Sequence, residues 1–309
     1  MLLIKVICST YLVCLMNYVY GYYTLKFLGI RNFDSTIFEK ISVGIFALGS
    51  FSLLINFFNP INPFVNNSFL IIFVILLFFQ FKSKSLTNRI LINILFVSLL
   101  SLLLIAFAKF QEDFPWYSLP YISLVNFEKI SFGISNVQFR FGHISILQYS
   151  SSALPNFLIN NEFISLPNVI IFSSFSLLIL NELILNKDSK KTPDLYFYLF
   201  FLSIFIFTKF TRFSEYGNDV PAHVLVFFTI YNFIKFQNVK NETYKKSIFK
   251  KILLFSTIAV LQKIQYLFII LLPIYLIIKN KNIIYKNLLI ITCCIFISST
   301  WLIKNFINT

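Results

Sequence analysis

The stretch at residues 208–223 reads TKFTRFSEYGNDVPAH and gathers the side chains with the most conspicuous chemistry in the chain. Five ionisable residues lie there between two apolar runs: Lys209, Arg212, Glu215, Asp219 and His223. Ionisable groups placed between membrane-spanning segments are costly to keep and are functional candidates by default. The guanidinium of Arg212 matches a phosphate, and Lys209 adds a point charge near the level of lipid phosphates. We therefore expect this stretch to bind an anionic substrate group.

Paired carboxylates at Glu112 and Asp113 open a second polar segment, directly after an apolar run. Pro115 and Trp116 follow them and would hold the pair at the edge of the membrane. A partly desolvated carboxylate there is suited to act as general base on a hydroxyl, which makes Asp113, or Glu112, the expected catalytic residue. The competing interpretation is a solvated acidic pair that caps a loop.

Other candidates also have structural interpretations. Asp219 is both a substrate-binding candidate and a helix N-cap candidate, because Pro221 suits the first turn of the next helix. His223 is more often an interior histidine than a ligand at such a position. Lys263 and Lys304 are cations at helix ends that either bind substrate or extend along the membrane to its surface.

The composition predicts an integral membrane protein. Hydrophobic residues make up 58% and charged residues 12%, against about 45–50% and about 25% in soluble domains. The net charge of +14 is explained by basic cytoplasmic loops rather than by nucleic-acid binding. The four cysteines lie in apolar runs without a nearby histidine, so no metal site is predicted.

Apolar runs of about 20 residues predict an all-α transmembrane bundle that forms one domain over residues 1–309. The expected spans cover residues 6–25, 41–58, 64–81, 90–108, 163–181, 195–208, 220–234, 252–278 and 288–303. Lys263 interrupts residues 252–278, which therefore form either one tilted helix or a hairpin of two short helices. The hairpin gathers most of the 26 basic residues on one side, so the positive-inside rule favours about ten spans.

This topology places residues 109–162 and 209–219 together outside the cell, in two loops that carry acids. The first loop contains prolines yet is rich in aromatic residues, so we expect short amphipathic helices at the membrane interface. Two acid-bearing loops on one side of a bundle predict a single external site.

Four segments, EDFPWYSLPY, FGISNVQFRFGHIS, RFSEYGNDVPAH and WLIKNFINT, resemble an uncharacterised family of bacterial polytopic membrane proteins related to the GT-C glycosyltransferases. The resemblance covers residues 109–309 and implies a polyprenyl-phosphate-linked sugar donor. Asp113, or Glu112, matches the acidic motif of the first external loop, and Arg212 and Asp219 match the second-loop motif. Ser118 stands where the motif has histidine, which argues against a metal or proton-relay role there. Because the family motif at WLIKNFINT continues into further helices, we expect the chain to be a fragment of a longer protein.

The residues and the resemblance together predict a glycosyltransferase in the inner membrane of a bacterium. It would move a sugar from a polyprenyl-phosphate donor to a cell-surface glycan or lipid acceptor on the external face. No cofactor is required by these residues, although a divalent cation is compatible with them. Two alternatives stay open: a polysaccharide polymerase or lipid-linked sugar flippase or transporter, and an inactive membrane fragment. A transporter is expected to carry charges inside its spans and to show internal repeats.

Overall fold

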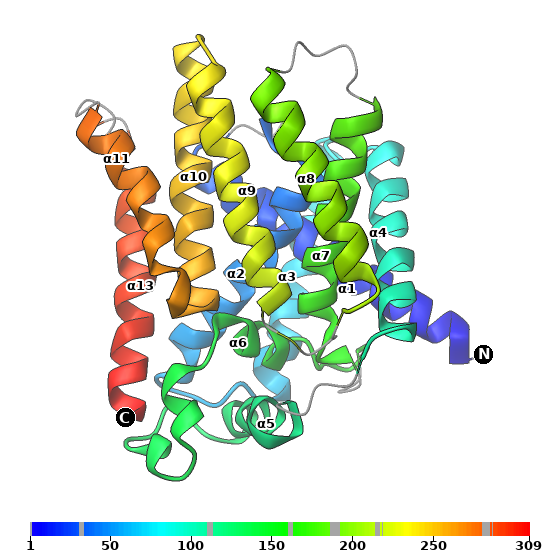
Figure 1. The fold of residues 1–309 in the computed structure, drawn as a ribbon. Coiled ribbons are helices and arrows are strands. Elements are labelled where there is room, and N and C mark those ends of the chain that lie inside the picture. The colour runs from blue at the N-terminus through cyan, green and yellow to red at the C-terminus, as the bar shows by residue number, and fades with distance from the viewer. Residues whose placement is uncertain are drawn as a thin grey trace.

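A computed structural model describes residues 2–30, 34–109, 114–159, 163–185, 192–213, 217, 219–279, 285 and 287–309, and this part of the chain contains helices and turns but no strand (Figure 1). The long helices are α1 (Leu2–Phe27), α2 (Ile37–Asn56), α3 (Pro63–Lys82), α4 (Asn88–Ala106), α7 (Leu166–Leu180), α8 (Pro193–Phe210), α9 (Asp219–Asn238), α10 (Glu242–Gln262) and α13 (Leu288–Asn308). The shorter elements are η2 (Phe114–Ser118), α5 (Leu119–Phe127), η3 (Ile134–Asn136), η4 (Phe139–His143), α6 (Ile146–Ser152), η6 (Asn181–Leu185), η7 (Ile264–Ile270) and α11 (Leu271–Lys279).

The chain is a multi-pass membrane protein. Within the described ranges, seven helices are long and apolar enough to cross a bilayer: α1, α2, α3, α4, α7 extended into η6, α8 and α13. The remaining long elements, α9, α10 and the η7–α11 segment, pack alongside these in the same bundle (Figure 1). The expectation of an all-helical bundle is confirmed, and the number of ten spans stays a prediction.

The bundle is built around α2 and α7. In the most apolar window of each helix, 83% of α2 and 78% of α7 is buried, against 17% of α8, which leaves α8 at the lipid-facing periphery. α1 crosses α2 at two glycines, where a Cβ at Gly21 would collide with the carbonyl oxygen of Lys40 and one at Gly44 with that of Asn17. Small residues allow such close backbone approach between membrane helices. The α1–α2 contact therefore depends on glycine at both positions.

The segment after α10 reverses direction at Lys263. α10 ends at Gln262, Lys263 is extended (φ −154°, ψ 110°), and η7 and α11 then run back along α10 (Figure 1). The hairpin predicted from the charge distribution is confirmed, because Lys263 lies at a turn rather than in the middle of one long helix. α10 begins earlier than the sequence suggested, at Glu242, so residues 242–251 are helical and not part of a long basic loop.

The first polar loop folds into short helices, as predicted, but one of them is not interfacial. All seven residues of α6 are buried, and the Ser150 hydroxyl donates a 2.7 Å hydrogen bond to the carbonyl oxygen of Ile45 in α2. Gly49 lies at this contact, where a Cβ would meet the Ser150 hydroxyl. The prediction of amphipathic surface helices is therefore wrong for α6, since the glycine of α2 lets α6 enter the bundle.

Candidate functional site

The two polar loops meet at the same end of the bundle. The backbone N–H of Lys109, at the start of the first loop, donates a 2.9 Å hydrogen bond to the carbonyl oxygen of Phe213 in the second loop. The buried ring of Phe213 stacks on Phe172 of α7, with centroids 5.3 Å apart. The Asn168 amide also reaches the carbonyl oxygen of Gly217, at 3.5 Å. The expected juxtaposition of the loops is thus present, and α7 is the helix that holds the second loop.

Three of the predicted site residues, Glu112, Asp113 and Glu215, lie outside the described residues. The described chain stops at Lys109 and resumes at Phe114, the residue that follows Asp113. The described residues on either side of the two acids in the sequence are Lys109, which is bonded to the second loop, and Phe114, which begins η2.

A small pocket lies where these elements converge. It has a volume of about 10 Å³, about enough for one water-sized group. The described residues of its wall are uncharged and belong to η2, α5, α6, α7 and the segment before α7: Phe114, Ser118, Ile122, Leu147, Gln148, Ser151, Ile164, Ser165 and Asn168. The side-chain oxygen of Gln148 is buried and has no hydrogen-bond partner among the residues that the structure describes. The described wall of the pocket thus offers hydroxyl and amide groups, and it includes Phe114, the residue after Asp113 in the sequence.

The two predicted phosphate ligands, Lys209 and Arg212, lie at the end of α8. Lys209 lies in the last turn of α8 and is half-buried, whereas Arg212 is exposed in the turn that follows. Arg212 directly precedes Phe213, whose carbonyl oxygen accepts the hydrogen bond from Lys109 in the first loop. Both cations therefore lie near the junction of the loops and stay accessible to a ligand.

Asp219 and Lys263 come together as an ion pair between the first residue of α9 and the α10–η7 turn. The side chain of Asp219 is 63% exposed, so the pair contributes little to stability. His223, one turn further along α9, packs against the rings of Phe205 and Tyr266, with centroids 6.3 and 5.6 Å away. His223 is thus half-buried among aromatic rings, and its Nδ1 has no hydrogen-bond partner among the described residues.

Lys304 has a different location from the other predicted ligands. It is completely buried, and its ammonium lies 5.8 Å from the ring centroids of Tyr121 and Trp301. Tyr121 belongs to α5, whose neighbouring residues Ser118 and Ile122 line the pocket. Lys304 is therefore enclosed by aromatic rings and does not extend to the surface of the protein.

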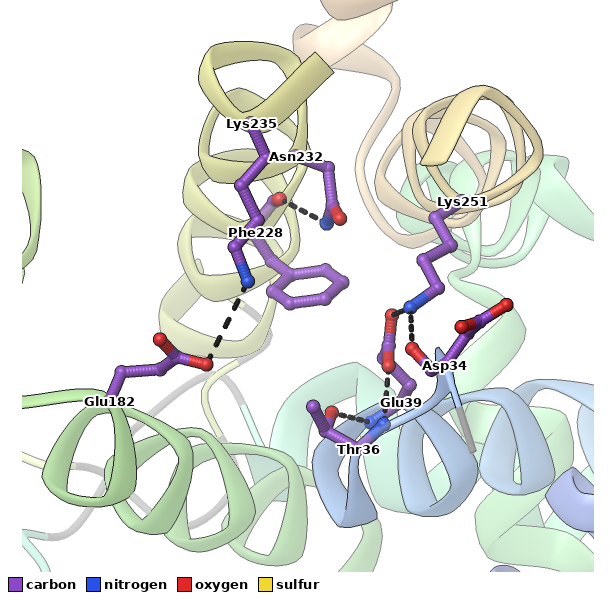
Figure 2. Close-up of polar contacts among 8 residues, drawn as sticks. All are labelled: Asp34, Thr36, Glu39, Glu182, Phe228, Asn232, Lys235 and Lys251. Carbon is purple, nitrogen blue, oxygen red and sulfur yellow. Dashed lines mark hydrogen bonds and ion pairs between the residues drawn. The ribbon is translucent and has the colours of Figure 1, made fainter. Parts of the chain in front are cut away.

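The sequence analysis missed a buried cluster of charges at the other end of α2 (Figure 2). Glu39 and Lys251, with side chains 1% and 6% exposed, form a 2.8 Å ion pair. Lys251 also donates to the backbone carbonyl of Asp34, and Thr36 and Glu39 form a reciprocal capping box at the start of α2. On the other side of Phe228 from this ion pair, the Nζ of Lys235 in α9 lies 3.7 Å from the Oε1 of Glu182 in η6 (Figure 2). The Thr36-x-x-Glu39 spacing was the available signal, because it is typical of a capping box.

Comparison with known proteins places the whole chain in one family. The chain belongs to the family defined by a domain of unknown function (DUF8201), which matches residues 1–309. No curated protein and no solved structure matches the chain.

Proposed function

We propose that this member of the DUF8201 family is a membrane glycosyltransferase that moves a sugar from a polyprenyl-phosphate donor to a glycan or lipid acceptor. The observation that carries the proposal is the junction of the two polar loops through the Lys109–Phe213 hydrogen bond. It supports one shared site, with carboxylates entering from the first loop and cations from the second. The proposed location is the inner membrane of a bacterium, with the site on the external face, where the less basic loops lie.

The chemistry assigns a role to each loop. A sugar on a lipid phosphate already carries a good leaving group, so the enzyme must activate the acceptor hydroxyl and stabilise the departing phosphate. Asp113, or Glu112, takes the proton of the acceptor hydroxyl, while Arg212 and Lys209 bind the phosphate oxygens. Asp219 and Lys263 close the second loop against the α10–η7 turn and border the phosphate.

The pocket supports an uncharged, hydroxyl-bearing substrate group at this site. Gln148 presents a buried acceptor oxygen, and the described residues of the wall supply three serine hydroxyls and no charged side chain. With a volume of about 10 Å³ the pocket admits one hydroxyl-sized group, so a sugar ring would remain at its mouth.

A second candidate is a lipid-linked sugar flippase or transporter. The specific observation in its favour is the Glu39–Lys251 pair, because buried charges within membrane helices are a feature of transport pathways. The two candidates differ in their requirement for Asp113. General-base catalysis needs its carboxylate, whereas transport that uses the Glu39–Lys251 pair does not, because that pair lies at the far end of α2.

The test is transfer of a radiolabelled sugar in proteoliposomes that contain polyprenyl-phosphate sugars and an acceptor glycolipid. Asp113→Asn is expected to lower the transfer rate by about 10²–10⁴-fold, the contribution typical of general acid–base catalysis. Glu128→Gln, in an exposed acid of the same loop, is the matched control and is expected to leave the rate unchanged. Full activity in Asp113→Asn would remove the general-base assignment.

The phosphate role is tested separately by donor binding. Arg212→Ala is expected to weaken binding of the donor lipid about tenfold or more, since it removes a charge-assisted contact of about 1.5–3 kcal/mol. Arg89→Ala, in an exposed arginine at the start of α4, is the control for the loss of one guanidinium. Unchanged donor binding in Arg212→Ala would exclude Arg212 as a phosphate ligand.

A further inference from the structure

The inward face of α13 carries a buried lysine that no acidic residue in the described part of the chain contacts. Lys304 is completely enclosed, between Trp301 and Asn308 on the same buried face of the helix. Its ammonium has no hydrogen-bond partner among the described residues. An ammonium has three N–H donors, and burial leaves all three without the water that would otherwise satisfy them.

Three aromatic rings surround the ammonium. The centroids of Tyr121 and Trp301 lie 5.8 Å away and that of Tyr149 lies 6.0 Å away. Ring faces attract a cation, but such contacts do not replace hydrogen bonds to a counter-ion. Burial raises the pKa of Tyr121 to about 12 and that of Tyr149 well above its ordinary value, so both phenols stay neutral. The rings therefore supply no negative charge to offset Lys304.

The same cluster presents further donors and has room beside it. The Tyr121 and Tyr149 hydroxyls lie 2.8 Å apart, and the Asn308 amide donates to the Tyr121 hydroxyl and to the carbonyl oxygen of Phe141, at 3.2 and 3.3 Å. These two amide contacts are longer than the commonest N–H···O distance of about 2.9–3.0 Å. Tyr121 and Asn308 also border a cavity of about 10 Å³, with the exposed Lys129 and Glu128 at its rim. Asn308 thus has space to move away from Tyr121.

We propose that Lys304 is the cationic centre of an oxyanion-binding site, which a phosphate oxygen reaches through this cavity when Asn308 moves aside. Lys304 and the tyrosine hydroxyls donate to the anion, and the Asn308 amide donates to it from its displaced position. The site shares α5 with the pocket that Ser118 and Ile122 line, because Tyr121 belongs to the same helix. It does not depend on the proposed glycosyl transfer, because the anion is recognised by charge and hydrogen bonding alone.

The phosphate has two sources, a free ion or the head of a polyprenyl lipid, and the test distinguishes them. The protein is placed in phosphatidylcholine nanodiscs, and its thermal unfolding is followed with inorganic phosphate, with undecaprenyl phosphate in the bilayer, or with sodium chloride at equal ionic strength. A ligand that binds only the folded protein raises the unfolding temperature in a saturable way. We expect such a rise with one or both phosphates and none with chloride.

The variants assign the effect to Lys304. Lys304→Met is expected to weaken phosphate binding at least tenfold, whereas Lys240→Met, in an exposed lysine between α9 and α10, should respond like the wild type. Asn308→Leu keeps the ammonium but narrows the entry, and it should also weaken binding. The proposal is overturned if the wild type responds to neither phosphate, or if Lys304→Met responds fully. Failure of Lys304→Met to fold would equally contradict it, because removing an unneutralised buried charge should not destabilise the protein. No readout requires sugar transfer, so this result is independent of the Asp113 test.

Discussion

The two ends of the bundle each bury a lysine, and their surroundings are opposite. Lys251 contacts the carboxylate of Glu39 at 2.8 Å and the backbone carbonyl of Asp34. Lys304 is enclosed by aromatic rings, without a hydrogen-bond partner in the part of the chain that the structure describes. Burial alone therefore does not define the role of a charge. Lys251 and Glu39 neutralise each other within the fold, whereas the N–H donors of Lys304 remain available to a ligand.

Breaking the satisfied pair gives the largest expected effect. Lys251→Met leaves the Glu39 carboxylate buried without its partner and should lower the free energy of unfolding by ~3–5 kcal/mol. The measurement is reversible unfolding in mixed detergent micelles. The double variant Glu39→Leu with Lys251→Met removes both charges and should recover most of the loss. An equally unstable double variant would show that packing, rather than the unpaired charge, is responsible.

Removing the unsatisfied lysine should act in the opposite direction. Lys304→Met replaces an enclosed ammonium with an apolar chain of similar volume, so it should leave stability unchanged or raise it by about 1–4 kcal/mol. The same unfolding measurement, in the absence of phosphate, checks this. A loss comparable to that of Lys251→Met would remove the distinction between the two lysines.

The smallest effect on the free energy of unfolding is expected from an exposed ion pair. Lys263→Met breaks the ion pair with Asp219, whose side chain is 63% exposed, and should change the free energy of unfolding by only about 0–1 kcal/mol. Raising the salt concentration should reduce even this difference, because exposed charges are screened. A larger, salt-independent effect would indicate that Lys263 fixes the α10–η7 turn by packing.

The sequence was most informative where one physical rule acts alone. Apolar length predicted the helices, and the uneven distribution of lysines and arginines correctly predicted the reversal at Lys263. The meeting of the two polar loops also followed from topology, because alternate connections lie at the same end of a bundle. The catalytic assignment of Asp113 and Glu112 stays a prediction, since both lie outside the described residues.

Charge alone was a poor guide to burial. The expected spans left Lys251 in the connection between residues 234 and 252, although it lies one turn inside the buried part of α10 and contacts α2. α6 was assigned to the interface, although the close approach allowed by Gly49 buries it entirely. Both errors arise because a single sequence shows the polarity of a segment but not the surface that will cover it.

By itself, the sequence determined a multi-pass helical protein with two polar loops at one end, because span length and charge distribution are set by the bilayer. Only the tertiary structure decided which charges are satisfied. Glu39 and Lys251 are more than 200 residues apart in the chain and become a pair through the packing of α10 on α2. Lys304 becomes an enclosed lysine, without a hydrogen-bond partner among the described residues, through the packing of α13 against Tyr121 and Tyr149. Such pairing depends on contacts between distant segments, which no local pattern specifies.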